Sequence, residues 1–202
     1  MTAAAPVFLS DPAARVRESV VAIVDRSRQS GLGAGFAWRR SDLFVTSAHV
    51  VADRKAVVVT PEGRAFEGTV VARDVERDLA VVRAPGTGVP AVTIGDPYAL
   101  RPGSLVFAVG HPLGVKDAVS VGVFQAVRPV PQGYGLAEQR SVRRGSAFIP
   151  WVQADVRLGP GNSGGPIADS VGWVIGVATM IVSGLALAVP APEVERLLER
   201  LG

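Results

Sequence analysis

Short apolar and β-branched runs recur along the whole chain, and glycine or proline residues separate them. Glycine occurs 23 times and proline 15 times, and both are spread over the full length. Many short runs bounded by turn residues are typical of an all-β sandwich or a pair of barrels. The predicted strands are Val20–Asp25, Ala34–Trp38, Ala56–Thr60, Ala65–Asp74, Leu79–Arg83, Leu105–Gly110, Ala118–Val127, Trp151–Ala154, Trp173–Met180 and Leu185–Val189.

Only two segments have the pattern of a helix. Asp11–Glu18 predicts a short helix with Asp11 as the N-cap and Pro12 at the first helical position. Ala191–Leu201 predicts the other, because apolar residues recur there at helical spacing and would dock on the body. These residues are Val194, Leu197, Leu198 and Leu201.

The segment Val171–Pro192 contains no charged residue, so a membrane span is one reading of it. Three glycines interrupt the segment, and Pro190 and Pro192 close it. Its many Val, Ile and Thr residues favour strands. We therefore expect a buried hairpin with its turn near Ser183 and Gly184, and no membrane span.

Residues 128–147 differ from the rest of the chain. They lack a clear period and carry proline, glycine and several charges. A loop of this length is usually functional or disordered. We expect a long loop here, and we take the arginines within it, Arg140, Arg143 and Arg144, as solvated.

The composition narrows the classes of function. The 202 residues are 48% hydrophobic and 19% charged, which indicates a folded body. The net charge is only +3 and most arginines are scattered, so no nucleic-acid partner is expected. There is no cysteine, and no zinc, phosphate-loop or dinucleotide motif is present, so neither a metal nor a cofactor is expected. Residues 1–10 lack the pattern of a signal peptide, which predicts a cytoplasmic protein if the chain is complete.

The run Gly161–Pro166 is the strongest candidate for chemistry. Glycines flank Ser163 on both sides, so the backbone can approach a substrate closely. The amide of a nucleophilic serine and a neighbouring amide can then bind the oxygen that becomes negative during acyl transfer. The alternative to a nucleophilic serine is that the same residues form a flexible Gly-Ser turn.

A nucleophilic serine needs a base, and the chain has two histidines. His49 lies between apolar residues that would hold it rigidly, whereas His111 lies in a turn sequence and is expected to be structural. Asp78 directly precedes an apolar strand and is the best candidate to orient His49. Competing carboxylates are Asp53, Asp74 and Asp155.

The order of these residues separates two architectures. Gly161-x-Ser163-x-Gly165 also matches the nucleophile elbow of α/β-hydrolases, in which the histidine follows the serine. No histidine follows Ser163 here. The order His, Asp, Ser is that of the chymotrypsin arrangement.

Eight segments in order resemble the protease domain of the HtrA (Deg) family of chymotrypsin-like serine proteases, and they cover about residues 19–200. These segments are Gly33–Phe36, Thr46–Val51, Arg77–Val82, Val109–Gly114, Val152–Asp155, Gly159–Pro166, Val174–Val177 and Ala186–Pro190.

The resemblance implies an all-β fold of two six-stranded antiparallel β-barrels and a C-terminal helix. Residues 1–18 would be an N-terminal segment and 19–202 the protease domain, with the two barrels meeting near 95–104. His49 and Asp78 would come from the first barrel and Ser163 from the second. The amides of Gly161 and Ser163 would form the oxyanion hole, with the Asn162 amide as a third donor.

The resemblance also implies a substrate class. The specificity pocket would lie near Leu158 and Ile181, which are both apolar, so cleavage after aliphatic residues of unfolded or damaged proteins is expected. No PDZ domain is expected after the protease domain if the chain is complete. A homotrimer formed through Val7 and Phe8 is a further expectation. Another is an inactive resting form, in which the Pro160–Gly161 peptide is flipped and the loop at 128–147 is mobile.

A second class of function is a non-proteolytic, chaperone-like binding module on the same fold. A pure binding module has no use for a nucleophile, a base and an orienting carboxylate together. The complete set therefore favours the serine endopeptidase.

Overall fold

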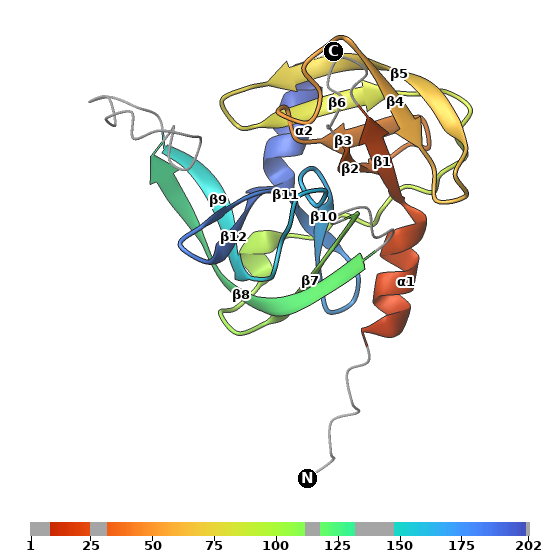
Figure 1. Ribbon diagram of the computed structural model, residues 1–202. Coiled ribbons are helices and arrows are strands. Elements are labelled where there is room, and N and C mark those ends of the chain that lie inside the picture. The colour runs from red at the N-terminus through yellow and green to blue at the C-terminus, as the bar shows by residue number, and fades with distance from the viewer. Residues whose placement is uncertain (1–8, 25–31, 112–117, 132–147, 201–202) are drawn as a thin grey trace.

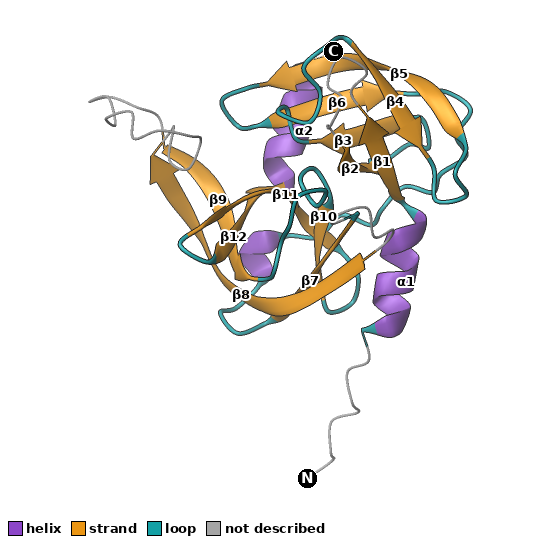
Figure 2. Cartoon of the chain, viewed as in Figure 1, coloured by secondary structure: helices purple, strands orange, loops and turns teal. Residues whose placement is uncertain are grey.

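The computed structural model describes residues 9–24, 32–111, 118–131 and 148–200. Twelve strands form two closed antiparallel barrels, and the helices lie beside them (Figures 1 and 2). The all-β fold class is therefore confirmed. The contacts expected from Val7 and Phe8, and most of the loop at 128–147 with its arginines, lie outside the described residues.

The first barrel has the strand order β1-β2-β3-β6-β5-β4. Strand β6 is buried on both faces from Leu79 to Val82, while β5 alternates and exposes one face. The barrel therefore closes around its own apolar centre. Its strands are β1 (Val20–Val24), β2 (Leu32–Ala37), β3 (Leu43–Thr46), β4 (Lys55–Val59), β5 (Ala65–Asp74) and β6 (Leu79–Arg83).

The second barrel has the order β10-β11-β12-β9-β8-β7. It is followed directly by α2 (Ala191–Glu199), which packs on β5, β11 and β12. Helix α1 (Ser10–Glu18) contacts β7, and the short 3-10 helix η1 (Pro97–Ala99) lies between the barrels in sequence. The strands are β7 (Leu105–Gly110), β8 (Ala118–Pro131), β9 (Phe148–Asp155), β10 (Pro166–Asp169), β11 (Val174–Val182) and β12 (Leu185–Pro190).

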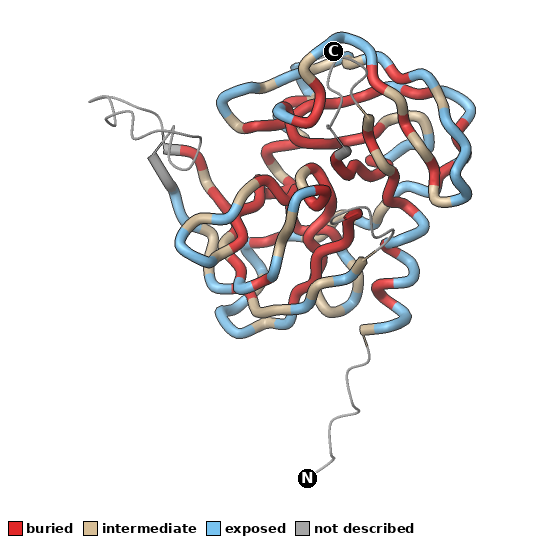
Figure 3. Tube along the Cα trace, viewed as in Figure 1, coloured by how far each residue is buried: buried red, intermediate tan, exposed pale blue. Residues whose placement is uncertain are grey.

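Three apolar clusters hold the fold together. One fills the first barrel around Ile23 and Phe44, and another fills the second around Phe124 and Ile175. The third joins residues of both barrels and both helices; Figure 3 shows buried chain throughout the region where the barrels meet. This shared cluster fixes one barrel against the other, so loops from both can build one site.

The hairpin predicted in Val171–Pro192 is confirmed. Strands β11 and β12 pair with Val182 opposite Leu185, and the two turn residues Ser183 and Gly184 have φ of 50° and 84°. Two positive φ angles define the type I′ turn that suits a two-residue hairpin. Within the described residues, the structure contains no helix of the length and apolarity that a membrane crossing requires.

Several predicted boundaries were wrong. Strand β8 continues to Pro131 and pairs with β9, with Pro129 opposite Pro150. The prolines in this ribbon looked like strand breakers, but proline is tolerated where its position lacks a ladder hydrogen bond. Strands β3 and β10 were not predicted, because each has only four residues. The N-cap of α1 is Leu9 rather than Asp11, so Pro12 lies two residues into the helix.

Candidate active site

His49 and Asp78 meet at one end of the first barrel. His49 follows β3 and Asp78 directly precedes β6, and these two strands pair with Thr46 opposite Ala80. The imidazole Nδ1 of His49 lies 2.7 Å from Oδ2 of Asp78, and the His49 backbone amide donates to Oδ1 at 2.9 Å. One residue thus contacts both carboxylate oxygens, and the ring can adopt few orientations.

The two side chains differ sharply in exposure. The side chain of Asp78 is 5% exposed and that of His49 is 43% exposed. A buried carboxylate is costly unless it is paired, and the two contacts to His49 provide that pairing. Because the carboxylate accepts at Nδ1, the proton of the neutral ring lies on Nδ1 and Nε2 is left as the basic atom.

The other predicted carboxylates have different surroundings. Asp74 binds Arg77 at 2.9 Å, and Asp53 and Asp155 are exposed. Sequence reasoning missed a second support for the His49 loop. Arg73 on β5 donates to the carbonyls of Ala48 and Ala52, each at 3.0 Å. The only sequence signal for this contact is a long cation on the neighbouring strand.

Ser163 lies in the loop between β9 and β10, and the backbone around it is bound to the first barrel. The Ala34 amide donates to the Ser163 carbonyl at 2.9 Å. The Gly164 amide and the Ser47 hydroxyl both donate to the Ala178 carbonyl, at 2.7 Å and 3.2 Å. Ser47 is two residues before His49, so these bonds bring the serine loop of one barrel to the histidine loop of the other.

Gly164 allows this close approach. Its φ is 84°, and a Cβ placed there would meet the Thr46 hydroxyl and the Ala34 carbonyl and lie 2.8 Å from the Ser47 amide nitrogen. Thr46 itself donates to the Ala34 carbonyl at 2.7 Å. A side chain on residue 164 would therefore push the serine loop away from the histidine loop.

The Ser163 hydroxyl is weakly held. Its Oγ donates to the Thr179 carbonyl at 3.4 Å, which is longer than an ordinary O–H···O hydrogen bond. Thr179 lies on β11 beside the serine loop. Little energy is therefore needed to release the hydroxyl toward a base or a substrate.

The turn before the serine has the geometry of a type II turn. The Asn162 amide donates to the Gly159 carbonyl at 3.0 Å, and Gly161 at the third position has a φ of 102°. Proline second and glycine third is the sequence that this turn favours. Neither the Gly161 amide nor the Ser163 amide donates a hydrogen bond to a residue that the structure describes. These two amides are the available donors for an oxyanion.

The expectation of a third donor at Asn162 was wrong for this conformation. Its amide is committed to the Gly159 carbonyl, and its carbonyl accepts from the Gly165 amide at 2.9 Å. Asn162 therefore shapes the turn. His111 is buried behind the same turn, and its backbone amide donates to the Gly161 carbonyl at 3.2 Å, in keeping with the structural role expected for it.

The two residues expected in the specificity pocket differ in their surroundings. Leu158 is partly buried against the core of the second barrel, while Ile181 near the end of β11 is 49% exposed. Both residues are apolar, and they lie on either side of Ser163 in the sequence. That they line one specificity pocket stays a prediction.

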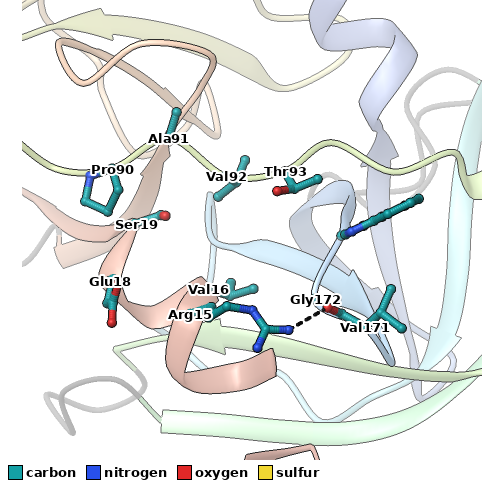
Figure 4. Close-up of a pocket in the computed structure, with 11 residues that line it drawn as sticks. Arg15, Val16, Glu18, Ser19, Pro90, Ala91, Val92, Thr93, Val171 and Gly172 are labelled. Carbon is teal, nitrogen blue, oxygen red and sulfur yellow. Dashed lines mark hydrogen bonds between the residues drawn. The ribbon is translucent and has the colours of Figure 1, made fainter. Parts of the chain in front are cut away.

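A separate cavity of about 260 Å³ lies away from these residues (Figure 4). Helix α1, the segment at 90–93 and the β10–β11 turn line it, and Arg15 donates across it to the Val171 carbonyl at 3.1 Å. None of the candidate catalytic residues lines it. In the part of the chain that the structure describes, no three His, Asp or Glu side chains are grouped as a metal site would require.

Comparisons with known proteins identify the family of this chain. The model of the trypsin-like peptidase domain matches residues 33–177. HhoB of Synechocystis sp. is 35% identical over 178 residues, covering 86% of this chain and 41% of that protein. The mitochondrial serine protease HTRA2 of Drosophila pseudoobscura pseudoobscura is 34% identical, covering 83% of this chain and 38% of that protein. This chain thus spans about two fifths of the length of these relatives.

Solved structures show the same fold. The HtrA-type protease AlgW with a tripeptide superposes with a TM-score of 0.83 at 26% identity, covering 96% of this chain and 64% of that one. The serine endoprotease from Yersinia pestis gives a TM-score of 0.78 at 25% identity, covering 98% of this chain and 68% of that one. This chain belongs to the trypsin-like peptidase family, as a protease domain of the HtrA (Deg) serine endopeptidases.

Proposed function

We propose that the chain hydrolyses peptide bonds with Ser163 as the nucleophile, His49 as the general base and Asp78 as the residue that orients His49. The observation that carries the proposal is the contact of both Asp78 oxygens with His49, at 2.7 Å and 2.9 Å, next to a serine loop bound to the same barrel end. This geometry leaves Nε2 of His49 as the proton acceptor.

The first half of the reaction is acyl transfer to the serine. The Ser163 Oγ attacks the peptide carbonyl carbon while its proton passes to Nε2 of His49. The carbonyl oxygen becomes negative and binds the Gly161 and Ser163 amides. When the C–N bond breaks, His49 gives its proton to the leaving amine, and an acyl-enzyme remains.

The second half releases the acyl group. Water attacks the ester carbonyl, and His49 accepts a proton from that water. The same two amides bind the second oxyanion. The C–O bond to Ser163 then breaks, the hydroxyl regains its proton from His49, and a carboxylic acid leaves. Both halves balance in atoms and charge with the residues named.

The substrate class follows from the apolar residues near the site. We propose cleavage after aliphatic residues such as Val, Ala or Leu in unfolded proteins, with Leu158 and Ile181 contacting that side chain. The apolar character of both residues supports this preference, because an apolar pocket without a carboxylate does not favour a basic side chain.

Casein hydrolysis by the wild type and by Ser163→Ala tests the activity. Removal of a serine nucleophile lowers kcat by on the order of 10⁶-fold, so the variant should show no cleavage above background. Equal cleavage by both proteins would refute the serine assignment. No cleavage by either, with aggregation of a denatured protein still suppressed, would favour the chaperone-like module.

A further inference from the structure

Arg77 connects the loop that carries Asp78 to the C-terminal helix. Its backbone amide and Nη1 bind the two oxygens of Asp74, at 3.0 Å and 2.9 Å. Its Nε donates to Oε2 of Glu193 at 3.0 Å. The other carboxylate oxygen of Glu193 accepts from Arg196. One side chain thus spans the end of β5 and the first turn of α2.

The loop needs external support, because Asp78 has a φ of 54°. A residue other than glycine in the left-handed region is strained and keeps that conformation only where its surroundings enforce it. Inside the loop, the Asp78 amide makes only a long 3.4 Å contact with the Val75 carbonyl. Asp78 is held from outside by the Ala48 amide, which donates to its carbonyl at 3.1 Å, and by His49. The neighbouring residue Arg77 adds further anchors, because its main chain and its side chain are both bound.

The partner of Arg77 belongs to the other barrel. Helix α2 directly follows β12, and it packs on β11 and β12 as well as on β5 (Figure 1). The nucleophile Ser163 also belongs to the second barrel. The Arg77–Glu193 ion pair therefore ties the loop of Asp78 to the body that carries Ser163.

The two partners of this pair differ in exposure. Glu193 is 1% exposed, and the side chain of Arg77 is 26% exposed. Burial opposes the charge of Arg77, but the hydrogen bonds and charges of Asp74 and Glu193 outweigh it and raise the pKa of Arg77 above its ordinary value. Without Glu193, Arg77 would keep only Asp74 as its partner, and without Arg77, Glu193 would keep only Arg196.

We propose that Arg77 and Glu193 are positioning residues of the peptidase: they hold Asp78, and through it the His49 imidazole, at the place where His49 meets Ser163. The proposal rests on the catalytic roles assigned to His49, Asp78 and Ser163 above. The alternative is a structural ion pair that stabilises the fold without affecting the catalytic step.

The test compares Glu193→Gln with Glu195→Gln. Glu195 lies on the same helix and accepts from Trp38 Nε1 and Arg39 Nε, both at 3.0 Å. Neither of these residues makes a hydrogen bond with residues 74–78. Both substitutions remove one charge and keep the side-chain shape. For each variant we measure stability in urea, kcat and KM for a peptide with an aliphatic cleavage site, and the proton NMR signal of the His49 Nδ1–H group.

Glu193→Gln should lower kcat about tenfold with KM unchanged, and it should shift the Nδ1–H signal. Glu195→Gln should leave kcat and the Nδ1–H signal at their wild-type values. If Glu193→Gln does not fold, Arg77→Lys replaces it, and we expect an intermediate loss of kcat with the same shift. Equal kcat and an unchanged signal in the two glutamine variants would overturn the proposal.

A parallel Ser163→Ala sample separates this outcome from a failure of the proposed function. If that variant still cleaves the peptide, the catalytic assignment is wrong, whatever Glu193 does. If it is inactive while Glu193→Gln matches Glu195→Gln, only the positioning role is overturned.

Discussion

Gly164→Ala adds one methyl group beside the nucleophile and removes no functional group. Residue 164 has a φ of 84°, and the added Cβ would meet the Thr46 hydroxyl and the Ala34 carbonyl and lie 2.8 Å from the Ser47 amide nitrogen. The left-handed backbone costs an alanine about 1–2 kcal/mol. Overpacking against buried groups adds about 1–3 kcal/mol. Because domain stability is typically about 5–15 kcal/mol, we expect the variant to fold.

Gly63→Ala is the matched control. Gly63 also has a φ of 84°, but a Cβ there has no neighbour within 4 Å. It should therefore lose only the backbone contribution of about 1–2 kcal/mol. The difference in the free energy of unfolding between the two variants, measured in urea, then isolates the steric contact at the site.

Enzymatic activity separates Gly164→Ala from Gly63→Ala more sharply than stability does. A displacement of about 1 Å between reacting groups can cost on the order of 10²-fold in rate. Gly164→Ala should lose kcat/KM for an aliphatic peptide by about that factor, while Gly63→Ala keeps the wild-type value. If the two variants are equally active, the close approach of the serine and histidine loops is not what Gly164 secures, and the reasoning is refuted.

Three further predictions concern other parts of the chain. Asp78→Asn should lower kcat by on the order of 10⁴-fold, because the asparagine side chain no longer holds the Nδ1–H form of His49. Steady-state peptide hydrolysis measures this change, and a loss of kcat under tenfold would contradict it. The hydrogen bond from Arg40, and then the charges of Arg40 and Arg83, outweigh burial and hold the pKa of Asp42 below its ordinary value. The stability that this carboxylate contributes should therefore be complete above its unfolded pKa of about 3.9 and vanish as the pH falls through the lower folded value, so urea unfolding of wild type and Asp42→Asn should converge in acid. Ser183→Gly should raise the free energy of unfolding by up to about 1 kcal/mol, because the turn residue has a φ of 50°; a loss of stability would contradict it.

Much of the architecture could be read from local pattern. Strands β5 and β6 have the predicted bounds, Ala65–Asp74 and Leu79–Arg83, because apolar runs between turn residues mark both ends. The hairpin turn at Ser183 and Gly184 follows from the same local chemistry. The pairing of β8 with β9 beyond residue 127 could not be foreseen, because it depends on which proline positions face each other in the sheet.

The candidate site was also only partly predictable from the sequence. His49, Asp78 and Ser163 could be selected from residue types, neighbours and order in the chain. The contact between Arg77 and Glu193 joins residues 116 positions apart, so only tertiary packing reveals it. The Asn162 amide could not be assigned from sequence either, because its acceptor depends on the turn that Pro160 and Gly161 form.

Covalent labelling tests the central claim most directly. A phosphonate diester with a valine-like side chain reacts with a serine that a base activates, and mass spectrometry of the digested protein locates the adduct. Our account predicts one adduct, on Ser163, formed by the wild type and reduced to background in His49→Ala. An adduct on another residue, or equal labelling of Ser163 when His49 is replaced, would contradict it.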